Sequence, residues 1–525
     1  MADDRHGPAR ALAFQRRPDR AGPVTMIGKS QAEPAAADRV ASRAEEPPAG
    51  QTARWRAALS LLRRHWLAAA LLAAGLILRV LAQLAYRPAL FYIDTARYVS
   101  NNPPGMDPLG YGGVLRAISP AGGVAAVAAV QHLLGLAMAV VIYVLLLRRG
   151  VARWLAAMAI APVLLDAYQL QIEQTIMPDA VFEALIVAGL VIAAWRPAVS
   201  WRRAAAAGLA LGASATVAQV GEALLVAAVI FLLAAGGGWR RAIGRAAALC
   251  AAFVIPILAY SAGSDLITGS FFLSHTGVTS FYGRTAAAVD CVTIRLSAAE
   301  RGMCPTRAQQ AHGPDWLEYS QGSPIRAYYN SRSLTRAQTD SEISTFNHAV
   351  LAQQAGRLLG AYGRDAAKLF ALTRVGSRGD TPISRWQFQR VFPYYPPWSS
   401  RQVVSTEISQ LGGGGKPAIW RPVATFLRAY QLDRGYTPGP LFALAALAGL
   451  AGSALAARRK ASQGVRQAAR GCLLFFASGV FVLGVSDLFE FSWRYQLPAL
   501  VTLVPAGALG ISVIIGSIRS RRRSS

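Results

Sequence analysis

Apolar residues in this chain gather into long, nearly uninterrupted runs that are separated by short polar turns. A helix that crosses a bilayer needs about 20 mostly apolar residues, and roughly ten of the runs approach that length. The runs cover residues 65–86, 121–147, 154–175, 179–195, 204–219, 222–236, 243–262, 438–457, 470–487 and 496–516. The fifth and sixth runs are short enough to be read as one long helix. The pattern therefore predicts an all-α polytopic membrane protein with about ten transmembrane helices.

Two stretches between these runs differ from simple turns. The first, at about 87–120, interleaves aromatic residues with short helical patterns, which favours interfacial helices in an external loop. The second, 263–437, is too polar to span a bilayer and carries a helical pattern from Glu342 to Leu372. A long external segment of this kind is typical of a lid or small domain that shapes a substrate site. The glycine run at 412–415 inside it predicts a mobile loop or hinge.

The chain is therefore expected to have five parts. The first lacks apolar periodicity and is rich in alanine, charged residues and proline, which predicts a disordered tail. In order, the parts are a cytoplasmic tail at 1–57, a transmembrane module at 58–262 that includes the first external loop, an external segment at 263–437, C-terminal transmembrane helices at 438–517 and a basic cytoplasmic tail at 518–525.

Charge changes this picture by fixing an orientation. The formal net charge is +27, with 54 Lys and Arg against 27 Asp and Glu. The basic clusters flank the apolar runs, at 63–64, 148–149, 196–203, 240–241, 458–460 and 521–523. With both termini in the cytoplasm, every cluster falls on the cytoplasmic side, as the positive-inside rule requires. This placement favours a multi-pass plasma-membrane protein over a nucleic-acid-binding protein.

Three carboxylates are expected at the opposite, external face. Asp94 follows the first apolar run, and Glu173 and Asp179 flank a proline-containing turn between the third and fourth runs. Ionisable residues at membrane depth are costly unless they are paired or hydrated, so they mark functional sites or structural ion pairs. Glu173 and Asp179 are predicted to point at one cavity mouth. Together with Asp94 they form a candidate site for a divalent cation, Mg²⁺ or Mn²⁺.

Other polar residues near this face are candidates for substrate contacts. Arg97 and Tyr98 follow Asp94 closely, and Arg494 lies at the outer boundary before the last run, where it is placed to meet a lipid phosphate. The alternative for Arg494 is a snorkelling arginine. Asp487 and Glu490 are expected to pair with Arg494 across this turn. His132 in the second run is either a base or a polar residue that is hydrogen-bonded between helices.

The cysteines add one structural expectation. Cys291 and Cys304 lie in the external segment, where an oxidising compartment permits a disulfide, with two free thiols as the alternative. The four cysteines show no zinc-ligand spacing.

Several of these motifs, in this order, resemble a known family. They are Phe91-Tyr92-Ile93-Asp94, Pro108 to Tyr111, Gln131-His132-Leu133-Leu134-Gly135, the Glu173 to Asp179 turn and Arg494-Tyr495-Gln496-Leu497-Pro498. The chain looks like the GT-C superfamily of integral-membrane glycosyltransferases. It is most similar to the protein O-mannosyltransferase and lipid A aminoarabinose transferase type, in an actinobacterial form.

The resemblance implies a reaction and some residue roles. Such enzymes transfer a sugar from a polyprenyl-phosphate donor, outside the cytoplasm, to a protein, glycan or lipid acceptor. Asp94 matches the family's first-loop catalytic acid, and Arg494 matches an arginine near the donor phosphate. Where many relatives carry an arginine after the fifth span, this chain has Thr216-Val217-Ala218-Gln219-Val220.

The residues themselves fit this chemistry but leave alternatives open. A single displacement with inversion needs one base for the acceptor proton, and Asp94 is the candidate. Glu173 and Asp179 would hold the acceptor, bind the cation or shift the pKa of Asp94. The main alternative is a secondary transporter or flippase, because such proteins also carry intramembrane carboxylates. A non-enzymatic scaffold for envelope assembly is a second alternative.

Overall fold

The computed structural model describes residues 60–100, 108–234, 238–330, 332, 334–374, 376–397, 400–411, 416–456 and 463–522. Several sequence predictions lie outside these residues: the tail at 1–57, the loop or hinge at 412–415 and the end of the basic tail at 523–525. Within the described residues, helices predominate, and the named strands are β1 (Tyr86–Arg87) and β2 (Ala418–Ile419).

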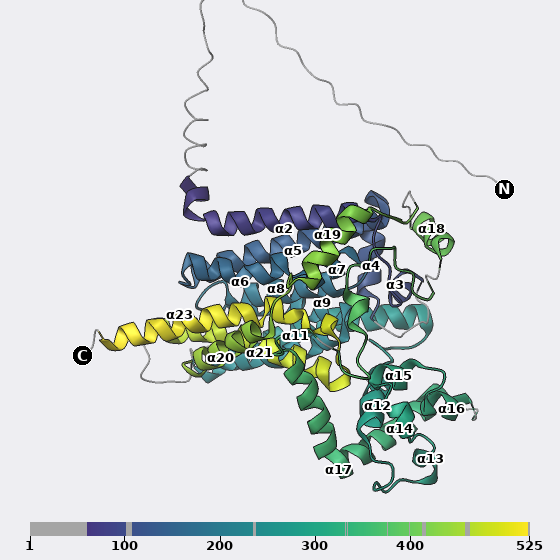
Figure 1. The fold of residues 1–525 in the computed structure, drawn as a ribbon. Helices are drawn as coiled ribbons and strands as arrows, with labels where there is room; N and C mark the ends of the chain where they lie inside the picture. Colours follow the sequence, from purple (N-terminus) through teal and green to yellow (C-terminus); the bar gives the residue numbers. More distant parts are fainter. Residues whose placement is uncertain are drawn as a thin grey trace, which may run out of the picture. The chain divides into compact units, whose positions relative to one another are not determined.

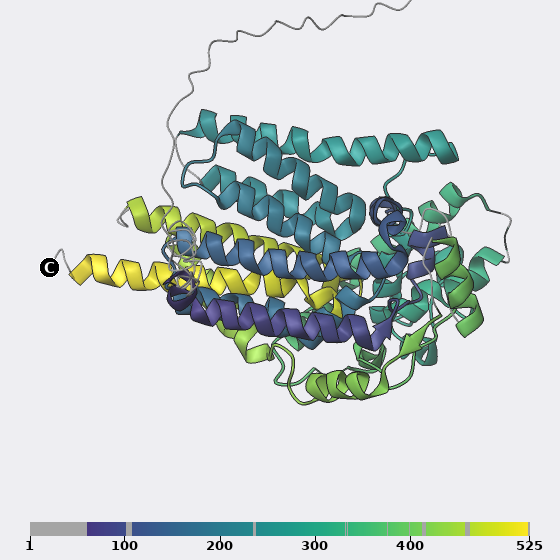
Figure 2. The same ribbon diagram turned by 90° about the horizontal axis from the view of Figure 1, so that it is seen from above.

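Every predicted apolar run is helical over most of its length, and these helices run side by side (Figures 1 and 2). They are α2 (Trp66–Ala85), α5 (Gly123–Arg148), α6 (Arg153–Leu165), α7 (Ala167–Gln174), α8 (Asp179–Ala194), α9 (Trp201–Val217), α10 (Ala223–Ala234), α11 (Trp239–Thr268), α20 (Gly439–Ala454), α21 (Gln463–Phe489), α22 (Pro498–Val501) and α23 (Leu503–Arg522).

The lengths of these helices test the membrane prediction. In the described part of the chain, five helices are long and apolar enough to cross a membrane, or six if the bent pair α6 and α7 counts as one span. Leu76, Ile77 and Val80 of α2 are 48%, 59% and 48% exposed. Contact of such side chains with lipid tails costs no free energy, because the tails are equally apolar. Helices suited to a membrane are therefore confirmed, while the count of ten spans stays a prediction.

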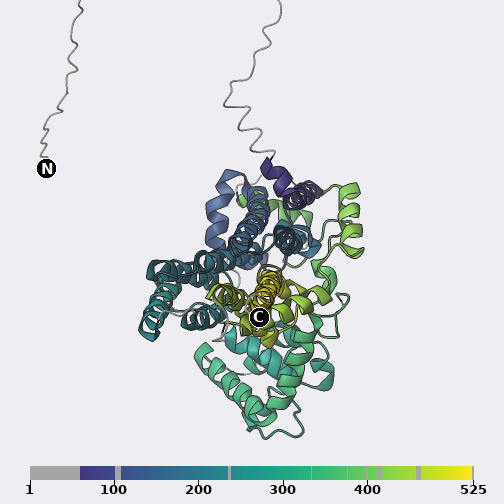
Figure 3. The same cartoon turned by 90° about the vertical axis from the view of Figure 1, so that its left-hand side faces the viewer.

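Small residues let some of these helices approach closely. A Cβ atom on Gly208 or Gly212 of α9 would lie 2.3 Å from the Leu249 carbonyl oxygen or 2.0 Å from that of Phe253, both on α11. Glycines four residues apart thus create a flat contact face, as in small-residue packing of membrane helices. In the end-on view, α9, α10 and α11 lie together at one side of the other helices (Figure 3).

The third apolar run is broken at Asp166, where α6 and α7 meet at a bend of 48°. Pro162 inside α6 removes one backbone donor, and the Asp166 carboxylate caps α7 by accepting from the Tyr168 N–H at 3.0 Å. Arg79 of α2 donates to the carbonyls of Val163 and Leu164, both at 3.0 Å, near the end of α6. A break inside an apolar region is tolerated because side chains satisfy the freed backbone groups.

The loop at 87–120, predicted to be external, is fixed at two places. It contains α3 (Thr95–Ser100), α4 (Gly110–Ile118) and η1 (Ser119–Ala121), which agrees with the short helices expected there. At its start, Tyr86 of β1 pairs with Ile419 of β2 in antiparallel register. Further on, the Leu90 N–H donates to the Gln174 carbonyl at 3.0 Å, and the Leu90 carbonyl accepts from Ile176 at 2.9 Å. These bonds place the loop against the turn between α7 and α8.

Residues 277–368 of the predicted external segment form a second group of helices with their own apolar core (Figure 1). The later elements of the segment, η3 (Ile383–Trp386), α18 (Arg401–Gln410) and α19 (Arg421–Leu432), instead contribute Trp386, Val404 and Ala424 to the cores of the other helices. The second group consists of α12 (Gly277–Ala288), α13 (Ala298–Arg301), α14 (Arg307–Gln310), α15 (Pro314–Tyr319), α16 (Pro324–Asn330) and α17 (Arg336–Lys368). Tyr282, Leu317 and Phe346 are fully buried in that core. Cys291 and Cys304, the pair expected from the sequence, are joined by a disulfide.

Candidate functional site

One arginine bridges two of the predicted acidic residues. Arg494 lies in η4 (Trp493–Gln496), and its Nη1 is 2.8 Å from Asp94 Oδ2 while its Nε is 2.8 Å from Asp179 Oδ1. The three side chains are 7%, 16% and 13% exposed, respectively. Two charge-assisted hydrogen bonds from one rigid guanidinium hold both carboxylates in a defined position.

Local backbone bonds explain why Asp94 reaches this position. The Tyr92 N–H donates to Thr95 Oγ1 at 2.9 Å, and the Thr95 hydroxyl donates to the Ile176 carbonyl at 2.9 Å. The turn that carries Asp94 is thereby attached to the residues just before α8. Asp179, the first residue of α8, lies at the other side of the same junction.

Beside this ion pair is a cavity of about 380 Å³, and Asp94, Arg97 and Arg494 contribute to its wall. Other lining residues come from the turn between α9 and α10, from α12, from α15 and from the end of α21, and include Val217, Val220, Ser280, Phe489 and Tyr495. A cavity with apolar walls and a few charged groups is typical of a small-molecule site. Asp179 contacts Arg494 but is not among the lining residues.

The first-loop candidates Arg97 and Tyr98 both line this cavity. Arg97 Nη2 is 3.6 Å from Asp94 Oδ1, and its guanidinium lies 5.2 Å from the Tyr319 ring centre. Tyr98 packs edge-on against Tyr111 at 5.3 Å between ring centres. Burial alone would raise the pKa of Asp94, but the nearby guanidinium groups of Arg97 and Arg494 outweigh it and hold that pKa below its usual value.

Three further carboxyl residues line the cavity, Glu222, Glu318 and Glu490, and the sequence did not single them out as site residues. Glu318 of α15 accepts a hydrogen bond from the Ser280 hydroxyl at 2.6 Å, and burial raises its pKa to about 7. Burial, and then the negative charges of Asp315, Glu318 and Asp94, raise the pKa of Glu490 well above its usual value. Glu318 lies in a stretch without strong periodicity, so only its charge could have signalled it.

Glu490 was expected to pair with Arg494, as was Asp487, and the structure corrects both expectations. The ion pairs of Arg494 go to Asp94 and Asp179 instead. Asp487 accepts from the Gln496 amide at 2.7 Å. Arg494 therefore pairs with carboxylates beside the cavity and not with those of its own turn.

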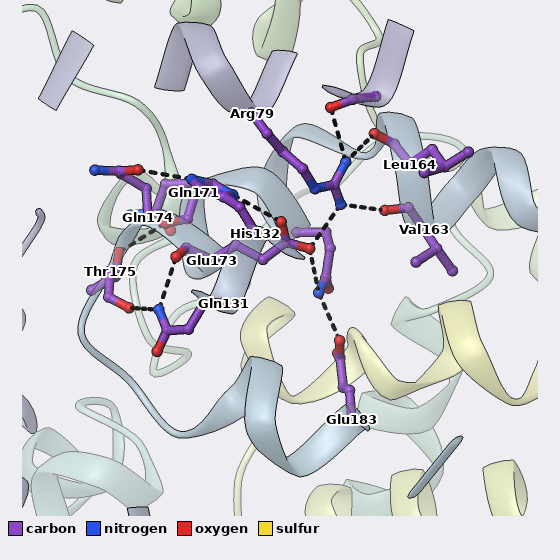
Figure 4. Close-up of polar contacts among 12 residues, drawn as sticks. Arg79, Gln131, His132, Val163, Leu164, Gln171, Glu173, Gln174, Thr175 and Glu183 are labelled. Atoms are coloured by element: carbon purple, nitrogen blue, oxygen red, sulfur yellow. Dashed lines mark hydrogen bonds and ion pairs between the residues drawn. The ribbon is translucent and has the colours of Figure 1, made fainter. Parts of the chain in front are cut away.

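Glu173 is not part of this cavity, so the prediction that it shares a mouth with Asp179 is wrong. Its side chain is fully buried, with Oε1 2.8 Å from Arg79 Nη2 and Oε2 3.0 Å from His132 Nδ1 (Figure 4). The physical reason is Arg79, a cation inside the first apolar run that needs a counter-ion at that depth. Gln169 adds a bond of 3.3 Å to Glu173 and one of 2.6 Å to Glu183.

His132 belongs to the same buried network. Its Nε2 lies 2.8 Å from Gln174 Oε1, while Gln131 beside it donates to the carbonyls of Glu173 and Thr175, both at 2.8 Å (Figure 4). This corresponds to the alternative of a polar residue hydrogen-bonded between helices. The structure thus places His132 and Glu173 together but apart from the cavity lining.

The residues present do not fit the divalent-cation site. Among the described residues, no group of three or more His, Cys, Asp or Glu side chains is arranged to hold a metal ion. Glu173 is bound to Arg79, and the remaining two carboxylates of the predicted set both hold the guanidinium of Arg494.

Comparisons with known proteins add little to this geometry. No protein-family model matches the chain, and no curated protein matches it. Among solved structures, it is similar to a chain of the S. cerevisiae protein O-mannosyltransferase Pmt1-Pmt2 complex bound to the sugar donor, with 16% identity and a TM-score of 0.31. The match covers 44% of this chain and 37% of that one. A similarity of this size does not decide function.

Proposed function

We propose that this protein is an integral-membrane glycosyltransferase. It moves a sugar from a polyprenyl-phosphate donor to an acceptor hydroxyl on the extracytoplasmic side of the plasma membrane, with inversion at the anomeric carbon. The observation that supports this best is the position of Arg494, a cation held by Asp94 and Asp179 at the wall of a 380 Å³ cavity.

The cavity offers suitable chemistry for such a donor. A guanidinium group binds phosphate oxygens through paired N–H donors, so Arg494 and Arg97 are the candidates to hold the donor phosphate. Val217, Val220 and Phe489 form apolar wall next to these cations. An isoprenoid chain would leave the cavity along such a wall and lie between the helices.

Asp94 is the proposed base. In the transfer step the acceptor hydroxyl gives its proton to the Asp94 carboxylate while its oxygen forms a bond to the anomeric carbon. The bond from that carbon to the phosphate oxygen breaks on the opposite face, and the electron pair leaves with the phosphate. Arg494 then neutralises the charge that develops on the leaving group.

The ion pair between Asp94 and Arg494 couples donor binding to base strength. In the structure two guanidinium groups lower the pKa of Asp94, which makes it a weak base. A donor phosphate that draws Arg494 towards itself removes part of the positive charge that stabilises the Asp94 carboxylate. Asp94 therefore becomes more basic when the donor is bound, and Asp179 keeps Arg494 in place during the exchange.

A secondary transporter or flippase is the second candidate, and the Arg79, Glu173 and His132 network favours it. Buried ionisable networks within apolar helices also serve proton and ion coupling. The two candidates differ in chemistry, because a transporter leaves the glycosidic bond of its substrate intact.

A transfer assay distinguishes them. Purified protein would receive radiolabelled polyprenyl-phosphate sugars and a mixture of hydroxyl acceptors, with and without EDTA. Wild type should release label from the lipid, and Asp94→Asn should be slower by about 10²- to 10⁴-fold, the usual contribution of a general base. Asp433→Asn, a change of the same kind at an exposed helix end, is the matched control. Full activity of a folded Asp94→Asn protein would overturn the proposal, and intact donors throughout would favour transport.

A further inference from the structure

The end of the helical bundle where α2 begins carries a repeated pair of residues. Four helices begin with a tryptophan beside an arginine: Trp66 with Arg64 at α2, Trp154 with Arg153 at α6, Trp201 with Arg202 at α9 and Trp239 with Arg240 at α11. These four tryptophan residues are 66%, 63%, 62% and 70% exposed. Tryptophan and arginine at helix ends are typical of the boundary between lipid and water. This end is separated from β1 by the whole of α2, which at 1.5 Å per residue is about 30 Å.

Two of these four pairs differ from the others because a large groove lies between them. The groove has a volume of about 740 Å³, and its wall includes both tryptophans, Trp66 and Trp154, and both arginines, Arg64 and Arg153. Leu67, Leu147 and Val151 supply apolar surface below them. The groove therefore combines two cations and two indole rings at its rim with an apolar floor.

The polar groups at the groove favour an anion. His65 completes the basic side chains in the wall, and its Nδ1 is 2.7 Å from the Tyr143 hydroxyl. Among the residues that the structure describes, no acidic side chain lines the groove. Both helices that border it, α2 and α6, begin without a side-chain cap and without an acidic residue in the first turn. Their N-terminal dipoles add to the positive potential of the arginines.

We propose that this groove binds the headgroup phosphate of an anionic membrane phospholipid. Arg64 and Arg153 hold the phosphate, and the two tryptophans flank the glycerol region at the depth where such rings settle in a bilayer. The apolar floor contacts the first part of the acyl chains. A soluble phosphate compound would gain nothing from that floor, so the charge and the apolar surface together favour a lipid.

The test is native mass spectrometry of the full-length protein in detergent, titrated with phosphatidylglycerol or with phosphatidylcholine. Wild type should bind one phosphatidylglycerol more tightly than any phosphatidylcholine. Arg64→Gln/Arg153→Gln should weaken this binding by about 30-fold, as expected for two arginines near an anionic lipid. Both arginines are exposed, so the double variant should fold.

The chain offers a matched control. Arg202→Gln/Arg240→Gln removes two arginines that lie beside exposed tryptophans at helix starts but do not line the groove, and it should leave the tight binding unchanged. A second variant, Ala152→Phe, keeps both arginines while a ring fills the groove, and it should also weaken the binding. Equal binding of the two lipids, equal loss in both double variants, or displacement of the lipid by millimolar glycerol phosphate would each overturn the proposal.

Discussion

Arg494 Nη1 lies 2.8 Å from Asp94 Oδ2, although 400 positions of sequence separate the two residues. The contact joins the loop at 87–120 to η4, which precedes α22. Substitutions of Arg494 should therefore affect both the reaction and the stability of the fold.

Arg494→Lys should lower the transfer rate by at least about 100-fold, the usual cost of losing one aligned donor to a developing anion. A lysine ammonium retains the charge but cannot present two fixed N–H groups to Asp94 and Asp179. Rates and thermal unfolding of the purified variant measure the effect. Arg494→Ala should in addition cost about 3–5 kcal/mol of stability, because it removes the ion pair of Asp179 and leaves Asp94 with Arg97 alone. A lysine variant with the wild-type rate would show that the guanidinium geometry is unimportant.

Arg97→Gln should move the acid limb of the pH–rate profile to higher pH. The folded protein has a lowered pKa at Asp94, and among the nearby cations Arg97 lowers it most. A carboxyl group whose pKa is lower in the folded protein stabilises the fold at pH values above its pKa in the unfolded chain. That stabilisation is lost as the pH falls through the pKa in the folded protein. The profile of kcat/KM against pH for the free enzyme reports this group. An unchanged acid limb would indicate that Asp94 is not the base.

Glu318→Gln should remove a pH dependence of stability between about pH 4.5 and 7. Burial raises the pKa of Glu318 from 4.5 to about 7, so the folded state binds a proton there that the unfolded state has released. This contribution is complete below the unfolded pKa and is lost as pH rises towards the folded value. Thermal unfolding at pH 5 and pH 8 should show a smaller loss of stability in the variant than in wild type. An equal loss of stability in variant and wild type would show that a group other than Glu318 causes the pH dependence.

Glu173→Gln should destabilise the protein by about 3 kcal/mol while the KM for the donor stays the same. The substitution leaves Arg79 without its counter-ion in a fully buried position. Arg79→Met/Glu173→Leu, which removes both charges and keeps their volume, should be closer to wild type in stability. Denaturation and transfer assays on both variants separate the two roles. A raised KM at unchanged stability would return Glu173 to the substrate site.

The helices could be predicted from the sequence because a run of about 20 apolar residues is a local signal. The site was predicted in part. Asp94, Asp179 and Arg494 could be singled out because they lie at the ends of apolar runs. Their mutual contact could not be predicted, because it depends on packing between distant helices. Glu173 was misplaced because Arg79 went unnoticed in the first run, where a lone cation requires a partner. Glu318 could not be singled out, because no sequence pattern around it indicates that the fold buries it and so raises its pKa.

The late position of Arg494 has a consequence for biosynthesis. A nascent chain that has not yet reached this residue holds Asp94 and Asp179 without the cation that joins them. The hydrogen bonds of Leu90 and Thr95 to the turn before α8 bring the two carboxylates near each other, where their like charges repel. The site is completed only when η4 takes its place, so a chain stalled before that point should be inactive, with Asp179 lacking the ion pair that Arg494 provides.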